Sequence, residues 1–386
     1  MKPHLGLIEI HPAPYRNATL ELVKSRNNVE LTVVSLFSID YGHTYRPEIV
    51  PSYSLVKLRK CIRFKNYTYY HPNNLQTLLS YDFDVILIPG YRSITSQASI
   101  LYCLLKNKPF IFSMDSILFP NHTNNNKKKF RNIVSHKFFN IIDSFWVPGE
   151  ASRQYLQSYG VEEERIFQGA YCLDREGIIK DCEAARPLRN LIRAEIGVHE
   201  KDWLFLFVGR IEEFRGLIYL IKSFAKLEKE VPESHLLIIG DGSDRINIES
   251  ECRRRNLKNV VFLDPMPMDK LINYYVAADT YVMPGLRENY SLSLAQAAIC
   301  GIPMISTNTV GAIKDYLIDG YSGLLVKSAD IDSLYRCMYK VVMNREFAHT
   351  MGENAKHISV FRTPSWAANQ LESAVFKSLE IHKNKR

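Results

Sequence analysis

The sequence lacks any hydrophobic run long enough to cross a membrane, since no apolar stretch approaches the roughly 18 residues that such a helix needs. It also lacks a signal-peptide pattern, because His11, Pro12 and Pro14 interrupt the amino-terminal segment before an apolar core forms. We therefore expect a cytoplasmic protein, either soluble or lying at the inner face of the membrane without crossing it.

Paired cysteine motifs are also missing. The seven cysteines are scattered, odd in number and never spaced as CxxC, which argues against a disulfide framework and against a zinc site. The sequence has no recognised nucleic-acid-binding motif, so nucleic acid is not an expected partner. A nucleic-acid-binding protein remains the alternative from another class, and salt-dependent binding of DNA or RNA in a gel shift would favour it.

Positive charge is concentrated in the first half of the chain. The formal net charge is +8, and residues 1–171 hold 20 Lys and Arg against 13 Asp and Glu. Two segments, 57–67 and 124–131, are rich in basic and aromatic residues. They are compatible with docking on an anionic membrane surface, where each cation contributes about 1 kcal/mol, and equally with an exposed, solvated basic surface.

Short apolar, β-branched runs alternate with helix-length segments in two series, a pattern typical of parallel sheets covered by helices. The first series comprises Leu5–Ile10, Val29–Leu36, Val85–Pro89, Pro109–Ser113 and Ser144–Val147, and the second comprises Trp203–Val208, Ser234–Ile239, Val260–Leu263, Thr280–Met283, Pro303–Ser306 and Leu324–Val326. The sequence thus predicts an α/β protein of two domains, for which 386 residues suffice.

The domain boundary is expected in the polar stretch Cys172–Lys201, which has no strong strand signal. We divide the chain into residues 1–180, residues 181–362 and a C-terminal segment, 363–386, with a helix over Thr363–Lys377. Within the second domain, Gly240 and Gly242 follow an apolar strand and precede a helical pattern, as a tight strand-to-helix turn requires. Such a turn occurs in many α/β folds, with or without a ligand.

Five consecutive segments of the second half have the order and spacing of a known family. They are FVGRIEEFRGLIYLIKSFAKL, HLLIIGDGSD, NVVFLDPMPMDKLINYYVAADTYVMPG, LRENYSLSLAQAAICGIPMIST and GAIKDYLIDGYSGLLV. This region resembles the family-4 retaining glycosyltransferases (GT4), whose GT-B fold consists of two Rossmann-like domains facing across a cleft. The first half is more loosely similar, through HPAPYRNATLELVK, PFIFSMDS and SFWVPGEASRQYLQSYGVEEERIFQGAYCLD.

The resemblance implies that residues 1–180 bind the acceptor, that residues 181–362 bind a nucleotide-sugar donor, and that the C-terminal helix packs back on the first domain. The donor would be a UDP- or GDP-sugar, and the acceptor a glycan or lipid-linked glycan of surface polysaccharide synthesis. No cofactor is expected, and because no DxD-like pair or cluster of His and Asp suggests a metal, cationic side chains must stabilise the leaving diphosphate.

Two arginines are the candidates for that task. Arg210 follows the predicted strand Trp203–Val208 after Gly209, and Arg215 stands beside Gly216 where a helix is expected to begin. A guanidinium binds phosphate oxygens bidentately, and amides at a helix start add partial positive charge. The family usually has Lys at the second position, so Arg215 keeps the charge but alters the geometry.

A second group of candidates lies between Glu288 and Gln296, where the family has two glutamates. By position, Glu288 approaches the donor sugar hydroxyls, and the residues after it hold sugar and phosphate at a helix start: Asn289, Tyr290, Ser291 and Leu292. The second glutamate normally accepts hydrogen bonds from the ribose. Gln296 replaces it here, and its carbonyl oxygen still accepts although the charge is lost.

In the first half, Asp115 follows a predicted strand and is either a catalytic residue near the cleft or a capping aspartate of a turn. His11, Tyr15, Arg16 and Asn17 either face the acceptor or connect a strand to a helix. The resemblance implies front-face transfer with retention of configuration, with the departing phosphate as base. The alternatives are a nucleotide-sugar hydrolase or epimerase of the same fold, and an inactive sugar-nucleotide-binding homologue.

Overall fold

The computed structural model describes residues 2–10, 12–36, 50–58, 61–63, 69–119 and 135–385, and the chain divides into two compact units. Unit 1 comprises Met1–Asp174 with Arg362–Arg386, and unit 2 comprises Arg175–Phe361. The expected boundary at residue 180 falls inside helix α6 (Arg175–Ala185), which belongs to unit 2 from its first residue. The chain therefore changes unit at the start of this helix and returns to unit 1 after Phe361.

Unit 1 contains a seven-stranded parallel sheet in the order β3-β2-β1-β6-β7-β8-β9. Its strands are β1 (His4–Glu9), β2 (Glu30–Ser35), β3 (Ser54–Lys57), β6 (Val85–Pro89), β7 (Phe110–Ser113), β8 (Ser144–Val147) and β9 (Ile166–Gln168). A short antiparallel pair, β4 (Ile62–Arg63) and β5 (Tyr69–Tyr70), lies outside it. All five strands expected in this half are present, whereas β3 and β9 were missed.

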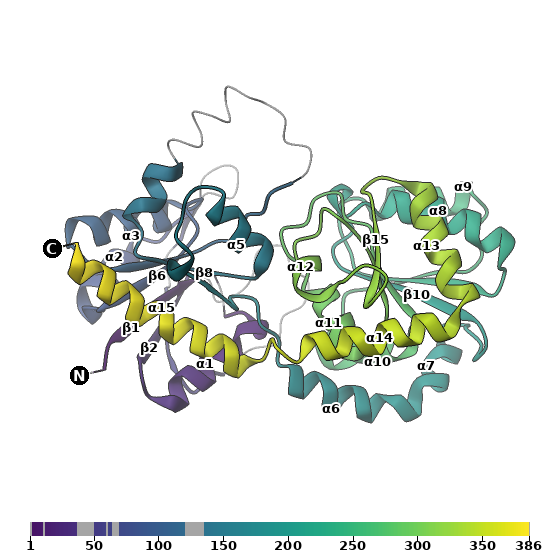
Figure 1. Ribbon diagram of the computed structural model, residues 1–386, viewed down its shortest axis with the longest axis horizontal. Coiled ribbons are helices and arrows are strands. Elements are labelled where there is room, and N and C mark those ends of the chain that lie inside the picture. Colours follow the sequence, from purple (N-terminus) through teal and green to yellow (C-terminus); the bar gives the residue numbers. More distant parts are fainter. Residues whose placement is uncertain are drawn as a thin grey trace, which may run out of the picture. The chain divides into compact units, whose positions relative to one another are not determined.

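The residues of this sheet alternate between two hydrophobic clusters, as the two-residue repeat of a strand requires. On one face pack α2 (Asn73–Tyr81), α3 (Ile94–Leu105), residues 135–141 and α5 (Glu150–Gln157). On the other face α1 (Pro14–Arg26) lies beside α15 (Pro364–Asn384), as Figure 1 shows. Leu371 and Val375 of α15 are fully buried there, so the C-terminal helix covers unit 1.

Unit 2 contains a six-stranded parallel sheet in the order β12-β11-β10-β13-β14-β15. Its strands are β10 (Trp203–Val208), β11 (Ser234–Ile239), β12 (Val260–Leu263), β13 (Thr280–Met283), β14 (Met304–Thr307) and β15 (Gly323–Val326). These match the six expected strands, four of them at both ends. The predicted α/β class with two Rossmann-like sheets is therefore confirmed.

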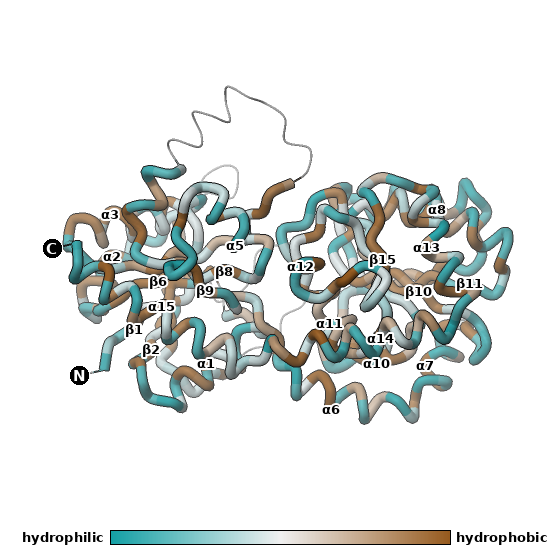
Figure 2. The backbone as a smooth tube through the Cα atoms, viewed as in Figure 1, coloured by the Kyte–Doolittle hydropathy of each residue, from teal (hydrophilic) through white to brown (hydrophobic). Residues whose placement is uncertain are grey.

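Helices cover both faces of this sheet (Figure 1). One layer contains α8 (Leu217–Glu230), α9 (Arg245–Arg254) and α13 (Ile331–Met343), and the other contains α6, α7 (Arg189–Glu195), α10 (Met268–Ala277), α11 (Leu292–Cys300) and α14 (Arg345–Ser359). Further short helices among the described residues are η1 (Glu163–Arg165) in unit 1, and η2 (Arg186–Leu188), η3 (Glu213–Arg215) and α12 (Ile313–Tyr316) in unit 2. Hydrophobic and hydrophilic residues alternate along α13 and α14 in Figure 2, as expected for helices that bury one side.

The order of the strands in unit 2 reverses between β10 and β13. From β10 the chain first builds outward through β11 and β12, and it then crosses back to place β13 on the other side of β10. Ligands of open α/β sheets bind at such a switch point, beyond the carboxyl ends of the strands. The loops that follow β10 and β13 are thus the first place to search for a site. Among the described residues, no helix is both long and apolar enough to span a bilayer.

Candidate functional site

The loop after β10 begins with a close contact between two glycines. Gly209 and Gly240 directly follow the neighbouring strands β10 and β11, and a Cβ atom at Gly240 would lie 1.9 Å from the carbonyl oxygen of Gly209. Gly240 has a φ of +151°, which also favours glycine. Gly240 therefore allows the two loops to pack closely. Gly209 also lies beside the guanidinium of Arg215, since a Cβ atom built at Gly209 would be 3.9 Å from Arg215 Nη1.

Both candidate arginines lie against one aromatic ring. The guanidinium carbons of Arg210 and Arg215 are each 5.4 Å from the centre of the Phe214 ring. Cations at this distance are attracted to the face of an aromatic ring, and this attraction restricts the conformations of both arginine side chains. Arg210 is exposed, whereas the side chain of Arg215 is only 13% exposed. Phe214 was not among the predicted residues, although an aromatic residue between two cations was a visible signal.

The loop after β13 is attached to the loop after β10. The backbone amides of Leu286 and Arg287 donate to the carbonyl oxygen of Phe214, at 2.9 and 3.2 Å. Gly216 has a φ of +71°, and a Cβ there would come within 2.2 Å of the carbonyl oxygen of Pro284. Only glycine fits this approach. The two loops, which lead into α8 and α11, are thereby held together.

An ion pair joins the two loops. Arg215 Nη1 contacts Glu288 Oε2, and both side chains are 13% exposed. The backbone of Glu288 is fixed by a third loop, because its amide donates to the carbonyl oxygen of Thr309 at 3.1 Å and its carbonyl accepts from the amide of Gly311 at 2.9 Å. The side chains predicted to bind phosphate and sugar therefore meet at one point.

The residues after Glu288 form the start of α11. Ser291 caps this helix, accepting from the amide of Leu294 at 3.3 Å, and Leu292 is the first helical residue. Asn289 is half-buried and Tyr290 is buried. The unpaired amides of a helix start carry partial positive charge, which is favourable for an anion. The second predicted group therefore lies at the same end of the sheet as Arg215.

Gln296, one turn further along α11, is engaged within unit 2. Its carbonyl oxygen accepts from the hydroxyl of Tyr275 at 2.9 Å, and its amide lies 3.2 Å from the sulfur of Met268. Burial raises the pKa of Tyr275 well above its usual value, so this hydroxyl remains a donor. One lone pair of the Gln296 carbonyl is left for a ligand. The predicted ribose contact stays a prediction.

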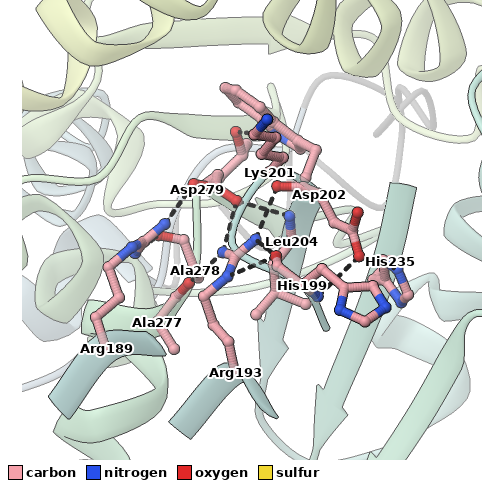
Figure 3. Close-up of polar contacts among 12 residues, drawn as sticks. Arg189, Arg193, His199, Lys201, Asp202, Leu204, His235, Ala277, Ala278 and Asp279 are labelled. Carbon is pink, nitrogen blue, oxygen red and sulfur yellow. Dashed lines mark hydrogen bonds and ion pairs between the residues drawn. The ribbon is translucent and has the colours of Figure 1, made fainter. Parts of the chain in front are cut away.

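A buried network fixes β10 against β13 at the opposite ends of these strands (Figure 3). Arg193 of α7 is fully buried and donates to the carbonyl oxygens of Ala277 and Asp202, at 2.8 and 2.7 Å, and to the carboxylate of Asp279 at 3.0 Å. Asp279, just before β13, also accepts from the amide of Leu204 in β10 at 2.8 Å. These hydrogen bonds thus hold β10 and β13, the strands that lead into the candidate loops, together at their amino-terminal ends.

Asp115 belongs to unit 1, where it accepts from the hydroxyl of Tyr171 at 3.4 Å. Beside Tyr171 lies the buried Arg16, whose Nε donates to the carbonyl oxygen of Ala170 at 2.8 Å. Arg16 thus has a structural partner. His11 and most of the basic segments 57–67 and 124–131 lie outside the described residues. Within the described ranges, no group of three or more His, Cys, Asp or Glu is arranged to hold a metal ion.

Residues 189–358, which make up most of unit 2, match the family model of Glycosyl transferases group 1. A curated relative, the D-inositol 3-phosphate glycosyltransferase of Corynebacterium jeikeium, is 30% identical over 186 residues, 46% of this chain and 43% of that protein. The protein of the same name from Nocardia farcinica is 28% identical over 243 residues, 60% of this chain and 52% of that one. The chain thus matches about half the length of these relatives, and the matches support the expectation of a transferase enzyme.

Solved structures extend the likeness to both units. HepE from Anabaena, in complex with UDP and glucose, has a TM-score of 0.69 and 15% identity, covering 96% of this chain and 98% of its own. The sucrose-phosphate synthase of Thermosynechococcus elongatus has a TM-score of 0.71 and 17% identity, covering 96% and 97%. At such identities the likeness concerns the fold alone, and it confirms the predicted GT-B fold.

Proposed function

We propose that this chain is a retaining glycosyltransferase of the GT4 type, which moves a sugar from a UDP- or GDP-sugar to a glycan or lipid-linked acceptor without a metal. The observation that carries the proposal is the Arg215–Glu288 pair, which joins the loops after β10 and β13 at the switch point of the sheet. The group 1 domain match covers this whole region. Among the similar structures, HepE from Anabaena holds UDP and glucose.

Arg210 and Arg215 stabilise the leaving diphosphate. Glu288 occupies one Nη of Arg215, but a guanidinium has five N–H donors, so others remain for phosphate oxygens. The Nε of Arg215 is buried and has no hydrogen-bond partner among the described residues, a state that a phosphate oxygen would relieve. The amides at the starts of α8 and α11 add partial positive charge where the bond to the leaving group breaks.

Glu288 orients the donor sugar. A carboxylate accepts hydrogen bonds from sugar hydroxyls, and the ion pair with Arg215 holds this one in place. The acceptor hydroxyl then attacks from the face that the nucleotide leaves, and the departing phosphate takes its proton. Asp115 of unit 1 and the neighbouring Tyr171 are candidate contacts of the acceptor. In this proposal the acceptor belongs to surface polysaccharide synthesis, and the basic segments 57–67 and 124–131 hold the enzyme at an anionic membrane.

The proposal is tested by thermal shift of the full chain with a panel of UDP- and GDP-sugars. A donor at 100 times its dissociation constant stabilises the protein by about 2.7 kcal/mol, and the absence of any shift across the panel would contradict the proposal. The thermal shift is repeated in excess chelator together with a measurement of turnover, and the chelator should change neither the donor binding nor the turnover. Rapid release of free sugar from the donor without any acceptor would instead identify the chain as a nucleotide-sugar hydrolase.

A further inference from the structure

Two cysteines that lie far apart in the sequence contact each other in unit 2. The sulfur atoms of Cys182 and Cys300 are 3.3 Å apart, although 118 residues separate them in the chain. Cys182 lies in α6, and Cys300 is the last residue of α11. A disulfide requires a sulfur–sulfur distance of about 2.0 Å, so the two atoms need to approach by only about 1 Å.

Both cysteines are buried, and Cys300 borders a cavity. Cys182 and Cys300 are 4% and 6% exposed. Cys300 and the three residues that follow it line a cavity of about 530 Å³ in unit 2, to which Arg186, Arg189 and Arg345 also contribute. A reagent scarcely larger than water can therefore reach Cys300, whose sulfur lies 3.3 Å from that of Cys182.

The surroundings give the two thiols different acidities. The hydrogen bond with Cys300 lowers the pKa of Cys182, and the charges of Arg186 and Lys356 act in the same direction, against burial and Asp181. Burial raises the pKa of Cys300 well above its usual value. Because the thiolate is the reactive form, Cys182 is the attacking group and Cys300 the partner that resolves the product.

We propose that Cys182 and Cys300 form a reversible disulfide in response to hydrogen peroxide, which makes this pair an oxidation site that ties α6 to α11. The sulfur of Cys182 attacks one peroxide oxygen, an S–O bond forms as the O–O bond breaks, and water leaves with the proton. The sulfur of Cys300 then attacks the sulfenic sulfur, and the S–O bond breaks to release a second water. Two thiols are oxidised and one peroxide is reduced to two waters.

The test is a peptide map of the full chain after brief peroxide treatment and alkylation. The exposed Cys61 is replaced by Ser in every sample to prevent disulfides between molecules. Trypsin then yields peptides 181–189 and 288–314, each with one of the two cysteines. We expect these peptides to be cross-linked after peroxide treatment of the folded Cys61→Ser protein, and to be separate after reduction with dithiothreitol.

Three variants and the melting temperature complete the test. Peroxide should raise the Tm of the Cys61→Ser protein, which is the parent of all the variants, because the new disulfide closes a long loop in the unfolded chain. Neither Cys182→Ala nor Cys300→Ala should show this rise. Cys252→Ala, which removes another buried cysteine of unit 2, should behave as the parent. Should either of the first two variants fail to fold, the peptide map of the parent protein decides alone.

The proposal is overturned if both thiols of the treated native protein are still alkylated, or if Cys300 is oxidised to the sulfonic acid without any cross-linked peptide. It is also overturned if the cross-link forms only in protein unfolded by urea. None of these outcomes depends on sugar-nucleotide binding, so the result is independent of the proposed function.

Discussion

Arg215 pairs with Glu288 across two loops that follow different strands of unit 2. The contact places a cation assigned to the leaving diphosphate against a carboxylate assigned to the sugar. Each charge therefore positions the other, and replacing either one removes a charge that lies against a mostly buried side chain. Effects of substitutions at the two positions should be non-additive, as expected for residues in direct contact.

Glu288→Gln should lower kcat by about 100-fold while changing the affinity for the free nucleotide little, because the lost charge acts near the reacting sugar. Steady-state rates with the donor and calorimetry with the nucleotide separate the two effects. Glu212→Gln is the matched control, since Glu212 lies in the same region but bonds to Ser243. Strongly weakened nucleotide binding with intact turnover would contradict the assignment.

Gln296→Glu should keep or tighten the affinity for the nucleotide, because a carboxylate is a stronger acceptor for ribose hydroxyls than an amide. The new side chain can still accept from Tyr275, and it loses only the contact with the sulfur of Met268. Calorimetry with UDP and GDP measures the effect. Tyr275→Phe serves as control for the internal hydrogen bond, and abolished binding in Gln296→Glu alone would show that this position does not contact ribose.

Arg193→Met should destabilise the protein by about 3–5 kcal/mol, because it removes a buried guanidinium from the carbonyl oxygens of Ala277 and Asp202 and from the carboxylate of Asp279. Urea unfolding monitored by fluorescence measures the loss. Arg253→Met on the surface of α9 should cost less than about 0.5 kcal/mol. Equal effects of the two substitutions would mean that the network in Figure 3 does not pin β10 to β13.

Lowering the pH should destabilise unit 2 through His235. Burial lowers the pKa of this side chain below 6.5, although the neighbouring Asp202 acts in the opposite direction. The folded state therefore binds the proton less readily than the unfolded chain, so the stabilisation is complete above pH 6.5 and falls as the pH drops below it. Between pH 8 and 5.5, the melting temperature of His235→Gln should fall less than that of the parent protein. The melting temperature of His349→Gln, which changes an exposed histidine, should fall as much as that of the parent.

Much of the fold could be predicted from local sequence. Strands such as Val85–Pro89 and Trp203–Val208 are continuous apolar runs with polar or glycine residues at their ends, and the structure gives them the same bounds. The two strands of the seven-stranded sheet that were missed, Ser54–Lys57 and Ile166–Gln168, are short and lie at its two edges. Edge strands bury less surface, and their hydrophobic pattern is correspondingly weaker.

The candidate site was only partly predictable. Arg215 and Glu288 were found from their motifs, but their contact depends on β10 and β13 being neighbours, which no local pattern reveals. The contact between Tyr275 and Gln296 depends in the same way on how α10 lies against α11. The pairing of Cys182 with Cys300 is a further case, since cysteine spacing carries no information about a contact that the packing of α6 on α11 creates.

The central claim is that Arg210 and Arg215 stabilise the diphosphate of a nucleotide-sugar donor, and direct titration of the nucleotide with paired turnover measurements tests it. Arg210→Ala and Arg215→Ala should each reduce turnover by orders of magnitude, about 3 kcal/mol of barrier, and weaken nucleotide binding without unfolding the protein. Arg254→Ala, which removes an arginine paired with Glu251 on α9, should leave both quantities unchanged. Wild-type affinity and turnover in both Arg210→Ala and Arg215→Ala would contradict the account.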